Sequence, residues 1–167
     1  MGLDMYLFAE QSFYGFEYGR PGEQERFAEL VELVGHVPSH QMPKVEVATC
    51  VAYWRKANHI HKWFVDNVQD GKDECQRSYV SPEELAELVQ TCRTAMTLYD
   101  AGDLRAAGEL LPPQAGFFFG GTEVDQSWRD GLAATVSQLE PLLTKHHEPG
   151  EPPWDPDNVT FFYEASW

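Results

Sequence analysis

Hydrophobic and polar side chains alternate at both ends of this 167-residue chain. Each end places four apolar residues on one side of an extended segment, namely Leu3, Met5, Leu7 and Ala9 near the start and Val159, Phe161, Tyr163 and Ala165 near the close. A period of two residues is typical of a strand that buries one face. We therefore expect both termini to lie in a sheet, where they are candidates to pair with each other.

Three further segments have the composition of strands. The aromatic stretch from Phe13 to Tyr18 is expected to follow the first strand as a hairpin. Lys44 to Val51 is expected to form another strand, and Gly116 to Phe119 a short one. Because hairpins join antiparallel strands, the sheet is predicted to be mostly antiparallel.

Helical spacing marks the segment that follows Ser81. Ser81 is a candidate N-cap, Pro82 suits the first helical position, and Glu84 completes a capping box. The apolar stripe that follows repeats every three or four residues through Leu85, Leu88, Val89, Cys92, Met96 and Tyr99. This pattern predicts a helix that runs to about Tyr99.

Two other segments are predicted to be helical. One spans Glu23 to Val34, and the other starts near Glu123, with Thr122 as its expected N-cap. Pro141 is expected to end or kink the second of these helices. Gly120 and Gly121, which precede the helix that starts near Glu123, could form an anion-binding nest. Acids in the first turn of that helix favour a plain glycine turn instead.

The segment from Trp54 to Cys75, WRKANHIHKWFVDNVQDGKDEC, concentrates aromatic, cationic, amide, imidazole and thiol groups. Helical spacing would place Tyr53, Ala57, Ile60, Phe64 and Val68 on the core face. Trp54, Asn58 and His61 would then follow the boundary of that face, while Arg55 and His59 would point to solvent. The sequence therefore predicts a ligand- or partner-binding surface made by Trp54, Arg55, Asn58 and His61.

Together these elements predict an α+β fold in one domain, residues 1–167. A mostly antiparallel sheet that includes both termini would be covered by about four helices. The hydrophobic content of 43% is sufficient for the core of a single domain.

The charge balance is strongly acidic, with 27 Asp and Glu residues against 12 Lys and Arg residues, a net charge of −15. Such a charge disfavours direct contact with nucleic acids and with anionic membranes, and it favours solubility or a basic partner. The N-terminus has no basic leader, and no long apolar run occurs, so a cytoplasmic location is expected.

Metal and cofactor motifs are not predicted. His59 and His61 would lie about 200° apart around a helix and could not readily share an ion. His146 and His147 are explained by a preference for cations near a helix C-terminus. Cys75 is surrounded by acids, which disfavour the thiolate that a nucleophile requires, and no phosphate-loop or dinucleotide motif occurs.

The blocks MGLDMYL, WRKANHIHKWFVDNVQDGKDEC, GFFFGGTEVDQSWRDGL and FFYEASW occur from one end of the chain to the other. In these blocks the chain resembles a family of small uncharacterised bacteriophage and prophage proteins. The resemblance implies a phage or prophage accessory protein in a bacterial cytoplasm. It implies no cofactor and no catalytic residue.

Three functional hypotheses follow. The first is a binding protein that engages a host protein or a small polar ligand through the segment from Trp54 to Cys75. The second is a small hydrolase or transferase in which His61 is the general base near Asn58 and Arg55 contacts an anion. The third is an acidic mimic of nucleic acid. Convergence of Arg55, Asn58 and His61 in one pocket would favour an enzyme or a ligand-binding protein.

Overall fold

The computed structural model describes residues 2–15, 22–35, 43–144 and 159–167. The fold is α+β, as predicted, with a four-stranded antiparallel sheet and, within the described residues, five helices. The strands are β1 (Asp4–Tyr14), β2 (Lys44–Arg55), β3 (Ser78–Val80) and β4 (Val159–Ser166), and their order across the sheet is β2-β1-β4-β3.

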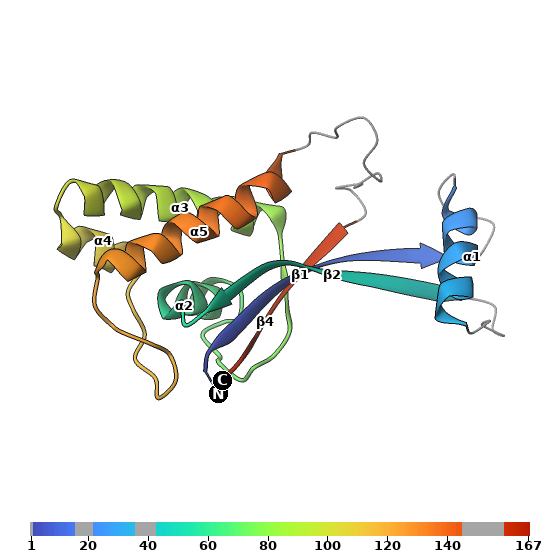
Figure 1. Ribbon diagram of the computed structural model, residues 1–167, viewed down its shortest axis with the longest axis horizontal. Coiled ribbons are helices and arrows are strands. Elements are labelled where there is room, and N and C mark those ends of the chain that lie inside the picture. The colour runs from blue at the N-terminus through green and yellow to red at the C-terminus, as the bar shows by residue number, and fades with distance from the viewer. Residues whose placement is uncertain (1, 16–21, 36–42, 145–158) are drawn as a thin grey trace.

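The two terminal strands lie side by side in the middle of the sheet. Asp4 pairs with Ser166 and Gln11 pairs with Val159, so β1 and β4 run antiparallel over almost the whole of β4. Figure 1 shows the two ends of the chain next to each other. The prediction that both termini belong to one sheet is confirmed.

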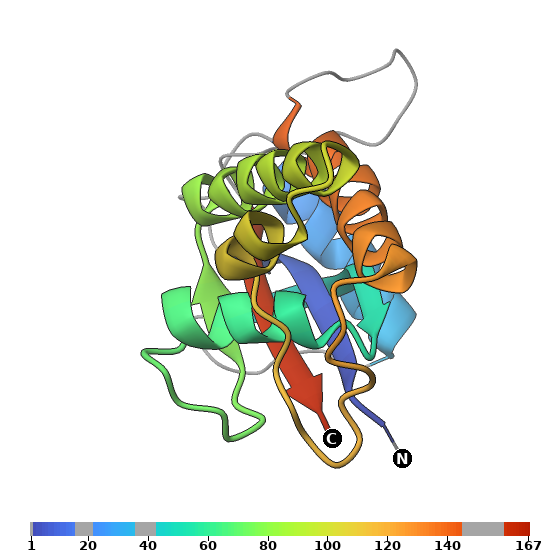
Figure 2. The same cartoon turned by 90° about the vertical axis from the view of Figure 1, so that its left-hand side faces the viewer.

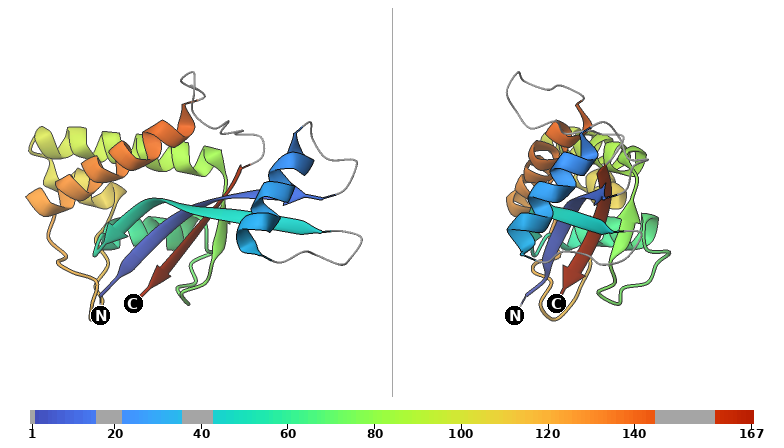
Figure 3. Two further views of the ribbon diagram at one scale, coloured as in Figure 1. Left: turned by 45° about the vertical axis from the view of Figure 1, so that its right-hand side comes forward. Right: turned by 90° about the vertical axis from the view of Figure 1, so that its right-hand side faces the viewer.

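The helices are α1 (Glu23–Val34), α2 (Asn58–Asn67), α3 (Pro82–Asp100), α4 (Leu104–Leu110) and α5 (Gln126–Leu143). Helices α3, α4 and α5 form a layer at one end of the molecule, beside α2 (Figure 1). In Figure 2 these four helices lie in front of the sheet. Helix α1 lies apart from them, against the far half of the β1–β2 ribbon, as Figure 3 shows.

The core lies between one face of the sheet and helices α2, α3 and α5. The predicted alternation is confirmed, because the core-facing residues of the terminal strands are buried while their neighbours are not. The ring of Phe64 on α2 stacks on Tyr163 of β4, with centroids 3.9 Å apart and planes 8° apart. This stack fixes α2 against the sheet.

Helix α3 begins as its sequence predicts. The hydroxyl of Ser81 accepts a hydrogen bond from the Glu84 backbone N–H at 3.2 Å, and the Glu84 carboxylate accepts one from the Ser81 N–H at 2.7 Å. Pro82 occupies the first helical position. The capping box is therefore present in full, and it satisfies N–H groups that a helix start otherwise leaves without acceptors.

Several predicted boundaries were wrong. Strand β2 continues to Arg55, so Trp54 and Arg55 belong to a strand and not to a helix. Strand β1 runs unbroken to Tyr14 where a hairpin was expected, and residues 16–18 lie outside the described residues. Pairing with β1 along its full length explains why β2 extends so far.

The glycine-rich run after α4 also differs from the prediction. Residues 116–119 form a turn instead of a strand, closed by a hydrogen bond of 3.2 Å from the Phe119 N–H to the Gly116 carbonyl, and the Phe119 ring occupies the space that a Cβ atom at Gly116 would need. Thr122 is not the N-cap of α5. That role belongs to Asp125, whose Oδ1 accepts a hydrogen bond from the Trp128 N–H at 3.0 Å.

Substitution of a core residue on β1 should measure how much of the stability depends on the buried face of the sheet. Leu7 is fully buried, so Leu7→Ala should lower the free energy of unfolding by about 2–5 kcal/mol. Leu33 on α1 is 83% exposed, and Leu33→Ala should change stability by less than about 0.5 kcal/mol. Urea unfolding followed by circular dichroism measures both, and equal effects would contradict this account of the core.

Candidate functional site

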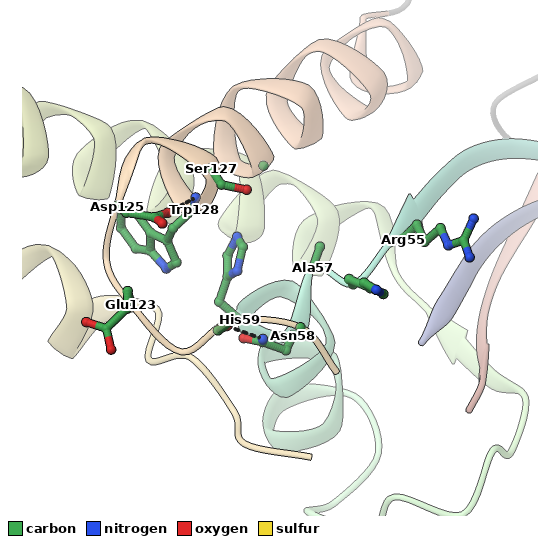
Figure 4. Close-up of a pocket in the computed structure, with 12 residues that line it drawn as sticks. Arg55, Ala57, Asn58, His59, Glu123, Asp125, Ser127 and Trp128 are labelled. Carbon is green, nitrogen blue, oxygen red and sulfur yellow. Dashed lines mark hydrogen bonds between the residues drawn. The ribbon is translucent and has the colours of Figure 1, made fainter. Parts of the chain in front are cut away.

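A cavity of about 430 Å³ opens between the end of β2, the first turn of α2, the loop before α5 and the first turns of α5. Figure 4 shows several of its side chains. It is lined by Arg55, Lys56, Ala57, Asn58, His59, Gly120, Gly121, Glu123, Asp125, Ser127, Trp128 and Gly131. The volume is in the range of sites that hold small molecules, which are roughly 300–1,000 Å³.

Asn58 joins the two walls of this cavity. Its side-chain amide donates to the carbonyl oxygens of Phe119 at 3.1 Å and Gly121 at 2.8 Å, and its Oδ1 accepts from the Gln114 N–H at 3.1 Å. The residue is 2% exposed. Asn58 therefore ties the loop of residues 114–121 to the start of α2.

The same loop approaches the chain closely at Gly120, whose φ is +98°. A Cβ atom at that position would lie 3.1 Å from the Cβ and 3.2 Å from the carbonyl oxygen of Lys56. Both the backbone conformation and the spacing favour glycine here. The two glycines that the sequence placed in a turn thus form one wall of the cavity.

His59 is the most unusual residue of the cavity. It is 5% exposed, and its Nε2 atom is buried without a hydrogen-bond partner in the part of the chain that the structure describes. Its ring packs against Trp128, with centroids 5.6 Å apart, and Figure 4 shows it standing between α2 and α5. A buried polar atom without a partner is destabilising, and in folded proteins such atoms are usually satisfied by ordered water or by a bound group.

Burial also sets the charge of this histidine. Desolvation disfavours the protonated ring and lowers the pKa of His59 from 6.5 to about 4. The ring is therefore neutral at pH 7, and it offers one donor and one acceptor nitrogen to its surroundings.

Gly131 makes room for this ring on the α5 side. A Cβ atom at Gly131 would lie 3.1 Å from both Cε1 and Nε2 of His59. Helix interiors usually disfavour glycine, so its position inside α5 has a packing reason here. A larger residue would push the imidazole away from α5.

The start of α2 gives the cavity a positive end. No side chain among the described residues caps this helix, and the first intrahelical bonds run from the Ile60 and His61 N–H groups to the Ala57 carbonyl. The preceding amides, those of Asn58 and His59, are the ones that a helix leaves without acceptors. Together with the helix dipole and the neighbouring Lys56, they favour an anionic group.

The opposite wall carries two acidic side chains, Glu123 and Asp125. The carboxylate of Asp125 already accepts a hydrogen bond at the start of α5. In Figure 4 the carboxylate of Glu123 points away from the His59 ring, and the guanidinium of Arg55 points toward the sheet. The Arg55 Nε atom lies 3.8 Å from Asp4. The start of α2 is therefore the end of the cavity that can accept a ligand group.

His61 lies elsewhere, although the sequence grouped it with Asn58. It is fully buried rather than partly buried, and it does not line the cavity. Its Nδ1 atom lies 2.7 Å from the Tyr163 hydroxyl, and its Nε2 atom lies 3.0 Å from Asp73. Burial raises the pKa of Tyr163 well above its ordinary value of 10, so this hydroxyl keeps its proton beside Nδ1. Both ring nitrogens are thus engaged.

The structure brings together only part of the predicted site. Asn58 and Arg55 line one cavity, whereas His61 faces the core and Trp54 is 4% exposed and donates its Nε1–H to Thr135 at 2.9 Å. His59 was expected to face solvent, and that expectation was wrong. Helix periodicity alone could not reveal its burial, because α5, about seventy residues later in the sequence, covers it.

Metal binding finds no support in the part of the chain that is described. No group of three or more His, Cys, Asp or Glu side chains there is arranged to hold an ion. The same residues include no helix that is both long enough and apolar enough to cross a membrane.

Comparison with known proteins identifies no family for this chain. No protein-family model matches this chain, and neither the curated proteins nor the solved structures include a significant match. The resemblance to phage and prophage proteins therefore stays a prediction.

Loss of the Asn58 amide should loosen the loop that closes the cavity. Asn58→Ala removes three hydrogen bonds and leaves buried backbone groups without partners, so unfolding free energy should fall by about 2–4 kcal/mol. Asn67→Ala is the matched control, because Asn67 is exposed and makes one bond to a backbone carbonyl. A similar, small loss in both variants, measured by urea unfolding, would contradict the role given to Asn58.

Acid should destabilise the protein through His59. Between pH 6.5 and pH 4 the unfolded chain binds a proton at this residue and the folded chain does not, so stability falls as the pH falls through this range. The contribution is on the order of 3 kcal/mol. His59→Gln should remove it, so the stability difference between pH 7 and pH 4.5 should be smaller in the variant. Equal pH dependence in the two proteins would refute the burial of an uncharged His59.

Proposed function

We propose that this chain is a binding protein for a small polar molecule that carries a carboxylate or phosphate group. The observation that carries the proposal is a cavity lined by the uncapped start of α2, where His59, in the first turn of that helix, has a buried Nε2 atom without a partner among the described residues. The ligand's anionic group would accept hydrogen bonds from the Asn58 and His59 amides, and it would lie beside the His59 ring.

The charge of the chain restricts the ligand to a small molecule. A net charge of −15 repels a polyanion such as a nucleic acid, whereas a single anionic group can be held locally by the amides and by Lys56. A setting in a phage- or prophage-carrying bacterium is part of this proposal, and it is supported by the sequence resemblance alone.

The general-base hypothesis receives less support. A base needs a free nitrogen within reach of the substrate, and both nitrogens of His61 already have partners inside the core. Arg55, Asn58 and His61 do not converge in one pocket, so these three residues together support neither an enzyme nor a ligand site, and the ligand proposal depends on the cavity beside His59 instead.

An NMR titration tests the proposed function. Acetate and inorganic phosphate are the probes, and backbone amide shifts are followed in a ¹⁵N-labelled sample. The amides of Asn58 and His59 should shift in a saturable way with at least one probe, while amides of the exposed helix α4 should not. Shifts spread evenly over the surface, or none at α2, would overturn the proposal.

Two variants sharpen this test. Lys56→Gly removes the cation, so ligand binding should weaken. Because Lys56 has a φ of +57°, the same substitution relieves backbone strain, and the free energy of unfolding should stay the same or rise. His59→Phe removes the unpartnered nitrogen, and it should raise stability at pH 7 by about 1 kcal/mol while weakening ligand binding. Variants that lose stability and keep full binding would argue for a purely structural His59.

A further inference from the structure

The sheet carries a band of aromatic side chains on the face opposite its core. Successive strands supply Tyr53 of β2, Tyr6 and Phe8 of β1, Phe162 of β4 and Tyr79 of β3. The rings form two contact groups, with centroids 5.3 Å apart for Tyr53 and Tyr6 and 6.1 Å apart for Tyr6 and Phe8 in one group, and 6.4 Å apart for Phe162 and Tyr79 in the other. We call these five residues the aromatic band.

The aromatic band is accessible in the described structure. Tyr53 is 45% exposed and Tyr79 is 57% exposed, and the other three rings are partly exposed. Tyrosine and phenylalanine gathered on one sheet face in this way are typical of protein-binding surfaces and uncommon on surfaces that serve solubility alone.

The chain itself shows which chemical group this face accepts. The Arg77 guanidinium lies over the Phe162 ring at 4.3 Å and over the Phe8 ring at 5.8 Å from the centroids. It also forms an ion pair with Glu10 at 2.5 Å and lies 4.0 Å from Glu164. Two aromatic rings and two carboxylates thus surround one planar cation, an arrangement that suits arginine better than lysine.

The charge of the surroundings points to a cationic partner. Asp4, Glu10 and Glu164 alternate with the rings on this face, and the whole chain has a net charge of −15. Long-range attraction therefore brings basic proteins toward the molecule, and it repels nucleic acids and anionic membranes. The aromatic band then discriminates among cations at short range.

We infer that the aromatic band docks an arginine-bearing segment of a basic partner protein. Arginine side chains of the partner stack on Tyr6, Tyr53 and Tyr79, and one of them competes with Arg77 for the Phe8 and Phe162 rings. This inference is independent of the ligand cavity, since it involves the other face of the sheet.

Removal of Arg77 gives the sharpest test, because it should increase binding. The probes are a short arginine-rich peptide and a lysine peptide of equal length, titrated by calorimetry. Arg77→Ala should bind the arginine peptide roughly tenfold more tightly than the matched control Arg105→Ala, which also removes one cation, from an exposed site on α4. The lysine peptide should gain less from Arg77→Ala, because an ammonium group can use the freed carboxylates of Glu10 and Glu164 but stacks less well on the rings.

A second pair of variants removes rings while keeping apolar area. Tyr53→Leu combined with Tyr79→Leu should weaken the arginine peptide several-fold, whereas Phe117→Leu, at a residue 95% exposed and outside the aromatic band, should not. Circular dichroism confirms that each variant is folded. If Arg77→Ala does not fold, the tyrosine pair decides alone.

Three results would overturn the inference. The first is equal affinity for the arginine and lysine peptides in all variants, which means attraction by net charge alone. The second is an Arg77→Ala variant that binds no better than Arg105→Ala. The third is a dimer, seen by sedimentation, that the tyrosine substitutions dissociate. That result would mean that the aromatic band binds a second copy of the chain.

Discussion

A β-strand can direct only every second side chain to one face, and this constraint acts most strongly on β1. β1 lies between β2 and β4, so it contributes to both faces of the sheet. Met5 and Leu7 are fully buried under the helices, and Tyr6 and Phe8 are consequently displayed on the other side. The core that positions α2 and the aromatic band therefore arise from one alternating sequence.

Two neighbouring residues at the start of α2 are both buried, but they differ in the hydrogen bonds that their side chains make. All three hydrogen-bonding contacts of the Asn58 side chain go to the loop of residues 114–121, so this residue is a structural tie. His59 is equally buried, yet its Nε2 atom has no partner in the described chain. The protein thus retains a destabilising polar atom beside a cavity, which is the pattern expected where binding has been favoured over stability.

Net charge and local charge lead to different conclusions about partners. The net charge of −15 governs the electrostatic attraction or repulsion of an approaching molecule, and at physiological ionic strength this interaction is screened beyond roughly 8 Å. Inside that range the uncapped amides of α2 offer a positive end, and the aromatic band with its carboxylates offers a site for a guanidinium. The two proposed ligands, a small anion and a basic protein segment, would therefore bind to separate parts of one acidic protein.

The sequence by itself determined the elements whose causes are local. Alternation at the termini, the capping box at Ser81 and the span from Glu23 to Val34 all depend on residues a few positions apart, and all were predicted correctly. The boundary between β2 and α2 was missed, because apolar residues near Trp54 fit either period and pairing with β1 decided for the strand.

Only the tertiary structure decided which side chains share a cavity. His59 is buried because α5 covers it, and Gly131 and Trp128, the residues responsible, lie about seventy positions away in the sequence. His61 left the expected site because Tyr163 and Asp73 approach it in the folded chain. Burial and hydrogen bonding between distant segments follow from packing, and periodicity within one segment carries no information about them.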